Sequence, residues 1–342
     1  MFKYKKYRYN FVKIIITILL LPLIIFKSNK VFSNYKMFCY TYPRFGKYES
    51  KNGEYKNLET ETNCLDYYYW DIKKMNIKQN SFSKQNLKEF SIDTSKGPIS
   101  CLQAKNKNSK KWVIGLHGWT EDKYLALRLT SHFYDQGYNV LTFDSFAHGK
   151  TYGEYTDIGF SSVEIINSII NFLKAEDDIS VIGLIGNSMG ASTSILYSQI
   201  GKYKVDWVVA DCGFSDIKTQ YRYYVQNNFL KKSWLFNTFR FTSKFSKLTK
   251  TNQSKYNLLK KMRENKNIPI FFIHAKGDTF IPFEMSLTMF NKKIKFEKDV
   301  ISQFWNPIGS EHVYVLSDYN DEYISKTLFF AKESEKNKNE TK

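Results

Sequence analysis

Residues 186–190 read Gly-Asn-Ser-Met-Gly, a GxSxG pentapeptide. They follow an apolar run that is typical of a buried strand and precede a segment that is typical of a helix. In that context, small residues at the first and last positions permit a strained turn that lifts the serine hydroxyl above the sheet. The helix that follows directs its positive end toward the negative charge that develops during acyl transfer. The pattern therefore predicts that Ser188 is a nucleophile.

A serine hydroxyl is a weak nucleophile unless a neighbouring base takes its proton, so one of the five histidines should serve it. His312 lies in a loop before a C-terminal helix and is the predicted base. His274 lies at the end of an apolar strand, where a hydrogen-bonded core histidine is the more common occurrence. His132 lies on a predicted helix and is expected at the surface.

An acid is needed behind the base, and Asp278 is the predicted one. It follows the apolar strand 268–274 in the sequence HAKGDTFIP, which puts it at the carboxyl end of the sheet. The chain order of the three groups is then Ser, Asp, His, which is the order found in α/β-hydrolases. Asp211 directly follows another strand, so it is the alternative acid, or a residue that bonds backbone near the serine.

Two backbone N–H groups are needed to bind the oxyanion. The N–H of Met189, next after the nucleophile, is the first predicted donor, and that of Trp119, in the turn of LHGWT, is the second. His117 in the same turn is expected to brace the loop. Asp144 and His148, which follow the next strand, are given the same structural role.

These groups have to be positioned by a parallel sheet. Short apolar runs alternate with amphipathic helical stretches, which indicates right-handed crossovers, a doubly wound sheet and ligand binding at the carboxyl ends of its strands. The fold class is therefore α/β with a mostly parallel sheet. The predicted strands are residues 112–116, 138–143, 179–185, 205–210 and 268–274, and the predicted helices include residues 124–136 and 191–200.

The alternation is interrupted between residues 214 and 263, in an aromatic and basic stretch that reads as helical. Because the stretch falls between two core strands, it is interpreted as a helical cap over the site, with an ordinary packing excursion as the alternative. The hydrolase domain is expected over residues 86–332. Residues 31–85 are expected to form a linker and an N-terminal extension, and residues 333–342 a polar tail.

Five basic side chains in residues 1–13 precede the apolar run 14–26, within an N-terminal segment of about 30 residues. This arrangement is shared by signal peptides and signal anchors. The run is short for a span, but no small-residue cleavage site follows it, so an uncleaved single-pass anchor is predicted. The basic residues before the run outnumber those after it, which places the catalytic domain outside the cytoplasm and makes the membrane a partner of this segment.

The net charge of +18 raises the possibility of nucleic-acid binding. No nucleic-acid-binding module accompanies the charge, so that partner is not expected. The four cysteines, Cys39, Cys64, Cys101 and Cys212, show no CxxC pairing. No metal site and no cofactor is therefore predicted.

In chain order, the segments LHGWT, DSFAHGKT, GNSMGA, ADCGF, HAKGDTFIP and SEHVY resemble the α/β-hydrolase superfamily. They look closest to its bacterial membrane-anchored hydrolases, akin to the serine aminopeptidase and monoacylglycerol-lipase-like branches. The resemblance extends over about residues 90–330. It implies triad roles for Ser188, Asp278 and His312, and oxyanion roles for Trp119 and Met189.

The expected activity is hydrolysis of a carboxylic ester through an acyl-enzyme, with lipid or lysolipid acyl esters favoured by an aromatic cap beside a membrane. A peptidase or amidase and an acyltransferase would use the same triad. A catalytically silent surface binding module is the alternative from another class. The sequence carries no signal for an oligomeric state.

Overall fold

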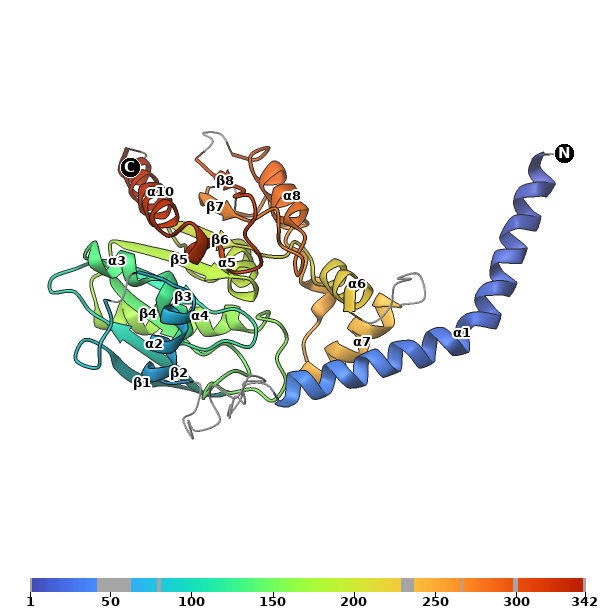
Figure 1. Ribbon diagram of the computed structural model, residues 1–342, viewed down its shortest axis with the longest axis horizontal. Helices are drawn as coiled ribbons and strands as arrows, with labels where there is room; N and C mark the ends of the chain where they lie inside the picture. Colours follow the sequence, from blue (N-terminus) through green and yellow to red (C-terminus); the bar gives the residue numbers. More distant parts are fainter. Residues whose placement is uncertain are drawn as a thin grey trace.

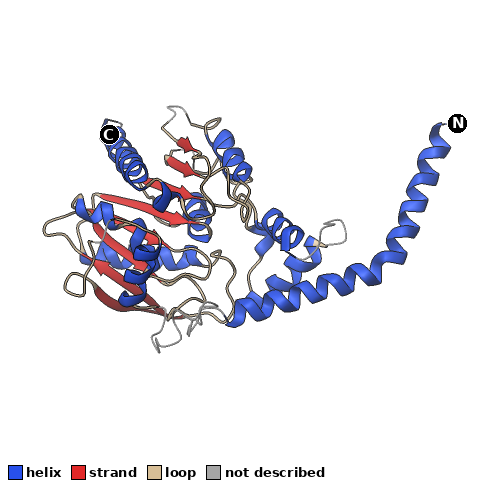
Figure 2. Ribbon diagram, in the orientation of Figure 1, coloured by secondary structure: helices blue, strands red, loops and turns tan. Residues whose placement is uncertain are grey.

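The computed structural model describes residues 2–41, 63–78, 81–228, 237–265, 267–297 and 301–340, with side chains in the first segment given for residues 11–33. An eight-stranded sheet lies at the centre of the described part, with helices on both sides of it (Figure 2). The sheet confirms the predicted α/β class.

The strands follow the order β1-β2-β4-β3-β5-β6-β7-β8. The first two strands join the sheet antiparallel, and every later pairing from β4 to β8 is parallel. The order doubles back at β3 and β4 and then proceeds outward, so the chain winds in both directions from β3. The strands are β1 (Lys88–Thr94), β2 (Gly97–Ala104), β3 (Lys111–Leu116), β4 (Asn139–Phe143), β5 (Val181–Asn187), β6 (Trp207–Asp211), β7 (Ile270–Ile273) and β8 (Gln303–Trp305).

Two hydrophobic cores cover the two faces of the sheet. Alternate residues of a strand point to opposite faces, so Ile114 of β3 enters one core and Val113 the other. The first core receives α4 (Ser162–Glu176), α5 (Met189–Ile200) and α8 (Phe283–Lys293). The second receives α2 (Leu65–Lys74), α3 (Ser131–Asp135) and α10 (Asn320–Glu340), while α9 (Val315–Asp318) leads into α10.

Three local predictions differ from the structure. Strands β1 and β2 form an antiparallel edge of the sheet that the sequence analysis did not identify. Residues 124–136 form a 3-10 turn, Leu125–Leu129, followed by the short α3, because the segment is buried all round rather than along one face. The expected polar tail is helical to Glu340, and Glu335 is buried, accepting a hydrogen bond from the Tyr138 hydroxyl.

The N-terminal helix α1 (Phe2–Thr41) projects away from the hydrolase body (Figure 1). It has Pro22 in its interior, and Figure 1 shows it bending part-way along its length, as a proline that removes a helix hydrogen bond would cause. Residues Phe11–Ser33 contain an 18-residue window with a mean hydropathy of 2.3 and form a stretch long enough to cross a membrane. The apolar helix is therefore longer than the run of residues 14–26 suggested, although a signal sequence has the same properties.

Two helices, α6 (Ile217–Asn228) and α7 (Thr238–Thr249), occupy the interval between β6 and β7 where a cap was expected. Helix α7 begins at Asn237, whose side chain accepts a hydrogen bond from the Arg240 N–H, and ends at Lys250 in the left-handed conformation. The pair lies between the hydrolase body and α1 (Figure 1). Helix α7 contacts α1, so the insertion between β6 and β7 joins the body of the domain to the N-terminal helix.

Candidate active site

Ser188 occupies the sharp turn between β5 and α5. Its φ of 52° and ψ of −114° are strained for a non-glycine residue, and its N–H donates to the Asp211 carbonyl at 2.8 Å. A side chain on Gly186 would collide with the backbone of Gly190, and one on Gly190 would collide with the Leu116 carbonyl. The two glycines of the motif are thus required by close packing around the turn.

His312 reaches the serine from the loop before α9. Its Nε2 lies 2.9 Å from the Ser188 hydroxyl oxygen, and its Nδ1 lies 2.7 Å from Oδ2 of Asp278. The carboxylate accepts a hydrogen bond from the Nδ1–H group, which leaves Nε2 as the acceptor that faces the serine. The structure therefore brings the three residues selected from the sequence into one hydrogen-bonded chain.

Asp278 is held by several donors at the carboxyl end of β7. Its Oδ1 accepts the N–H groups of Phe280 and Ile281, both at 2.8 Å. Burial raises the pKa of the Asp278 carboxyl, but hydrogen bonds from His274 and His312 outweigh it and hold that pKa below the usual value. The group is consequently a carboxylate at neutral pH.

His274 is fully buried, as expected of a core histidine, and it also contacts the triad acid. Its Nε2 faces two acceptors, Oδ2 of Asp278 at 3.0 Å and the Ile281 carbonyl at 2.9 Å, so Nε2 carries a proton. Its Nδ1 lies 2.7 Å from the Ser286 hydroxyl. The histidine therefore serves as a donor that fixes the carboxylate, a role that its place in an apolar strand did not reveal.

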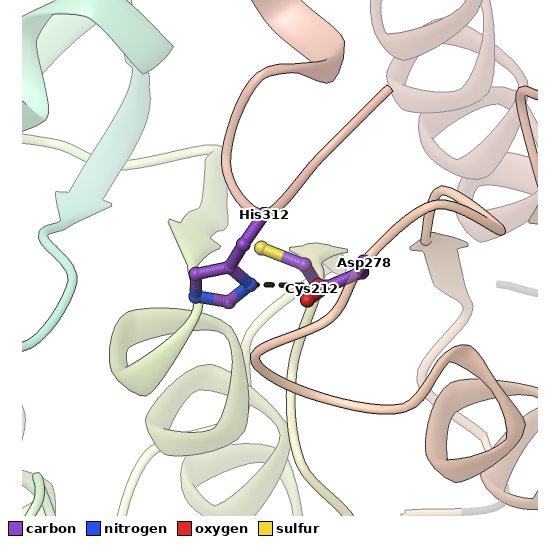
Figure 3. Close-up of side chains that lie close together, drawn as sticks. All are labelled: Cys212, Asp278 and His312. Carbon is purple, nitrogen blue, oxygen red and sulfur yellow. Dashed lines mark hydrogen bonds and ion pairs between the residues drawn. The ribbon is translucent and has the colours of Figure 1, made fainter. Parts of the chain in front are cut away.

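Cys212 lies beside the same pair, and Figure 3 shows its sulfur next to the His312 ring. One donor atom from each of Cys212, Asp278 and His312 falls within a 4.8 Å cluster, which is compatible in size with a metal site. Burial raises the pKa of the Cys212 thiol well above its ordinary value. Nδ1 of His312 bonds Asp278 and its Nε2 faces Ser188, so neither ring nitrogen is left for a metal ion, and Cys212 lies beside this hydrogen-bonded chain without being part of it.

Asp211, the alternative acid, lies at the end of β6 and is buried. Burial raises the pKa of its carboxyl to about 7, and its Oδ1 has no hydrogen-bond partner among the described residues. It makes no hydrogen bond to His312 among those that the structure contains, whereas Asp278 does. Of the two candidate acids, Asp278 is therefore the one that contacts His312.

Glu121 connects the two expected sources of oxyanion donors. Its Oε2 accepts the Gly118 N–H at 2.7 Å and the Asn187 amide at 3.1 Å. The first bond holds the loop that carries Trp119, and the second holds the residue before the nucleophile. Arg128 pairs with the other carboxylate oxygen of Glu121 and with Asp71. Neither Glu121 nor Arg128 was selected from the sequence, although the glutamate follows directly in the run HGWTE.

The remaining histidines play structural parts. Nε2 of His117 accepts the Ser145 N–H at 2.9 Å, which joins the loops after β3 and β4. The ring of His148 packs against that of His117 at 5.0 Å. His132, expected at the surface, is instead buried against α10, where it bonds Thr327 at 2.9 Å, and burial lowers its pKa to about 3. Its helix α3 packs beside α10 on the same face of the sheet, which the local pattern did not disclose.

Asp144 braces the loop after β4, as expected of it. Its carboxylate accepts hydrogen bonds from the N–H and the side chain of Lys123, from the Lys150 N–H and from Asn63. Burial raises the pKa of Asp144, but these positive and N–H partners lower it below the usual value. Lys123 is fully buried with its charge paired.

A narrow pocket of about 30 Å³ lies over the serine. Its walls come from the loop after β3, the start of α5, the cap helix α6 and the loop after Asp278. They are almost entirely apolar or aromatic. The residues are Trp119, Ile158, Ser188, Met189, Phe214, Ile217, Gln220, Tyr221, Tyr224, Phe280 and Ile281. The two predicted oxyanion residues thus share the pocket with the nucleophile.

Comparisons with known proteins agree with this geometry. Residues 111–267 match a family described as alpha/beta hydrolase fold. The chain is 28% identical to YqkD of Bacillus subtilis over 62% of this chain and 70% of that protein. It is 27% identical to a Mycoplasma genitalium protein named "Putative esterase/lipase 3" over 68% of this chain and 93% of that one.

Solved structures show the same fold. The esterase Pf2001 of Pyrococcus furiosus superposes with a TM-score of 0.59 at 25% identity, covering 77% of this chain and 95% of the esterase. An acylaminoacyl peptidase of Pyrococcus horikoshii superposes with a TM-score of 0.56 at 18% identity, covering 78% of this chain and 43% of the peptidase. The second likeness concerns the fold alone.

Proposed function

Because the chain belongs to the α/β-hydrolase superfamily, we propose that it is a serine hydrolase that cleaves carboxylic esters through an acyl-enzyme at Ser188. The observation that carries the proposal is the continuous hydrogen-bonded chain from the Ser188 hydroxyl through His312 to Asp278. The similarity of this protein to the Pyrococcus furiosus esterase supports ester hydrolysis as the reaction.

In the proposed reaction, Nε2 of His312 takes the Ser188 proton as the serine oxygen attacks the ester carbonyl carbon. Asp278 keeps the ring oriented and stabilises the imidazolium that forms. The N–H groups of Met189 and Trp119 receive the oxyanion. His312 then gives its proton to the departing alcohol. In the second half of the reaction a water molecule gives a proton to His312 as it attacks the acyl carbonyl carbon, and His312 returns that proton to the Ser188 oxygen as the acid leaves.

The walls of the pocket favour an apolar acyl group. Its volume of about 30 Å³ holds little more than one small group, whereas a pocket for a drug-sized ligand encloses about 300–1,000 Å³. A short acyl group is therefore accommodated best in this arrangement, and a lipid chain requires α6 to move outward. We place such a movement at the contact between Tyr224 and Phe280, whose rings lie 5.6 Å apart.

A membrane location supports access to apolar esters. Residues Phe11–Ser33 are proposed to form an uncleaved single-pass anchor, with the catalytic domain outside the cytoplasm. Only 6% of its apolar 18-residue window is buried within the protein, so the apolar side chains face outward along most of that window.

The test compares turnover of p-nitrophenyl butyrate by the full chain and by Ser188→Ala. Removal of a triad serine is expected to lower kcat by about 10⁶-fold, which leaves no measurable activity. Ser325→Ala is the matched control, because that serine is exposed and bonds only the Glu322 carbonyl. Unchanged turnover by Ser188→Ala would refute the proposal.

A further inference from the structure

A groove of about 570 Å³ lies between the N-terminal helix and the cap, away from Ser188. One wall belongs to the apolar stretch that is proposed to span the membrane, and the other to α7. Leu21, Ile24 and Ile25 form the first wall. The second is formed by Asn237, Phe239, Arg240, Ser243, Lys244 and Lys247.

The two helices are held together by specific contacts at the domain-proximal end of the span. The ring of Phe32 packs edge-on against Phe241 at 6.0 Å, and the Asn237 N–H donates to the Ser28 hydroxyl at 3.4 Å. Lys244 bonds Asn29 and lies over the Phe32 ring. These contacts fall within the last turn and a half before Ser33. Helix α7 therefore lies beside the domain-proximal half of the proposed span.

The two segments that form the groove carry basic residues but no acidic residues. Residues 1–41 and 217–263 contain 20 of the 51 Lys and Arg residues of the chain and none of its 33 Asp and Glu residues. The rest of the chain contains 31 basic and 33 acidic residues, which leaves it slightly negative. The whole positive excess of the protein therefore lies in the N-terminal segment and the cap.

Single side chains in the groove fit a ligand with both an anionic and an apolar part. Phe239 is 72% exposed beside the apolar wall. Nε of Arg240 is buried without a hydrogen-bond partner among the described residues. Lys247 lies two turns further along the same helix face and is exposed.

We propose that this groove binds one anionic phospholipid, with its phosphate at Arg240 and Lys247 and an acyl chain along Leu21, Ile24 and Phe239. The inference rests on the membrane anchoring proposed above and does not depend on catalysis. A guanidinium and an ammonium group are both strong phosphate ligands, and the apolar wall continues into the bilayer. The site would fix the cap and the pocket behind it at a defined height over an anionic membrane.

The test uses the full chain with Ser188→Ala, purified in detergent, so that no lipid ester can be consumed. The protein is equilibrated with phosphatidylglycerol or with phosphatidylcholine of the same acyl chains, and bound lipid is counted by native mass spectrometry. One phosphatidylglycerol per chain is expected to be retained, in preference to phosphatidylcholine. Equal retention of the two lipids would overturn the proposal.

Matched variants test whether phosphatidylglycerol binds at Arg240 and Lys247. Each basic side chain near an anionic lipid contributes about fivefold, so Arg240→Ala/Lys247→Ala should bind phosphatidylglycerol about 30-fold more weakly. The charge-preserving pair Arg240→Lys/Lys247→Arg should bind nearly as well as the parent protein. Lys202→Ala/Lys204→Ala removes two exposed lysines elsewhere and should leave binding unchanged.

Two results would overturn the proposed lipid site. One is undiminished phosphatidylglycerol binding by Arg240→Ala/Lys247→Ala. The other is a mature protein whose intact mass lacks residues 1–33, since one wall of the groove would then be missing. A chain that binds phosphatidylglycerol but whose unmutated form does not hydrolyse esters would instead overturn the proposed function alone. The two proposals therefore fail separately.

Discussion

Nε2 of His274 lies 3.0 Å from Oδ2 of Asp278, the same oxygen that receives Nδ1 of His312. A buried histidine thus donates a second hydrogen bond to the proposed triad acid. Because the bond lowers the pKa of the carboxyl, it also helps to keep Asp278 ionised.

Replacing His274 with leucine removes this donor and leaves Ser286 and the Ile281 carbonyl without their partner. We expect kcat to fall about tenfold with little change in KM, together with a loss of about 1–3 kcal/mol in the free energy of unfolding. Steady-state kinetics and urea denaturation measure both effects. His274→Gln retains an amide donor and should recover most of kcat. If Gln and Leu behave alike, His274 has only a packing role.

Asp278→Asn should lower kcat by about 10³–10⁴-fold, because an amide favours the wrong His312 tautomer. The substitution should also change the free energy of unfolding in a pH-dependent way. The folded-state pKa of Asp278 lies below the unfolded value, so its stabilisation is present above the unfolded pKa and is lost as the pH falls through the folded one. The unfolding free energies of the two proteins should therefore converge on acidification below about pH 4.

Asp211 is expected to behave in the opposite way. Burial raises its pKa to about 7, so the folded state favours the protonated form, and stability is lost as the pH rises from the unfolded pKa toward 7. Asp211→Asn should therefore raise the free energy of unfolding at pH 8 by roughly 1 kcal/mol or more, with little gain at pH 4. Thermal denaturation at several pH values measures this. Loss of esterase activity as severe as in Asp278→Asn would make Asp211 the triad acid instead.

Glu121→Gln tests the link between the two oxyanion elements. The variant keeps the shape of the side chain but removes the charge that pairs with Arg128 and weakens the bond to the Gly118 N–H. We expect kcat to fall about 10–100-fold at nearly constant KM, since one oxyanion donor contributes about 10²–10³-fold. Glu164→Gln is the control, because Glu164 pairs with Lys96 at the surface, and its kinetics should be unchanged. A pure rise in KM for Glu121→Gln would contradict the positioning role.

The cap helix should control the length of the acyl chain. Tyr224→Ala removes a pocket wall and its ring contact with Phe280, so the ratio of kcat/KM for octanoate to that for butyrate should rise by about 10-fold or more, given about 0.8 kcal/mol for each newly buried CH₂ group. A panel of p-nitrophenyl esters measures the ratio. Phe239→Ala, on α7 and outside this pocket, should leave it unchanged.

The sequence predicted the parts of the molecule that local patterns specify. The parallel strands could be recognised because each is a short apolar run followed by a turn, and the GxSxG motif has few other structural uses in that context. Strands β1 and β2 were not predicted from the sequence, because the residues of this edge hairpin alternate only weakly between exposed and buried positions.

The networks behind the site could not be read in the same way. Glu121 is recruited by the Gly118 and Asn187 groups only after two strands are paired, and His274 reaches Asp278 only when the loop after β7 folds back. His132 looked exposed because its helical pattern says nothing about α10, which is 195 residues away at the contact with Thr327. Tertiary contacts of this kind are set by the fold rather than by neighbouring residues.

The central claim is that Ser188 is the nucleophile, and covalent labelling tests it most directly. The full chain is treated with a fluorophosphonate, digested, and mapped by tandem mass spectrometry while residual esterase activity is followed. We predict one adduct per chain, on the Ser188 hydroxyl, with activity lost in proportion to labelling and no adduct in Asp278→Asn over the same period. An adduct on another residue, or esterase activity that persists after Ser188 is fully modified, would contradict the account.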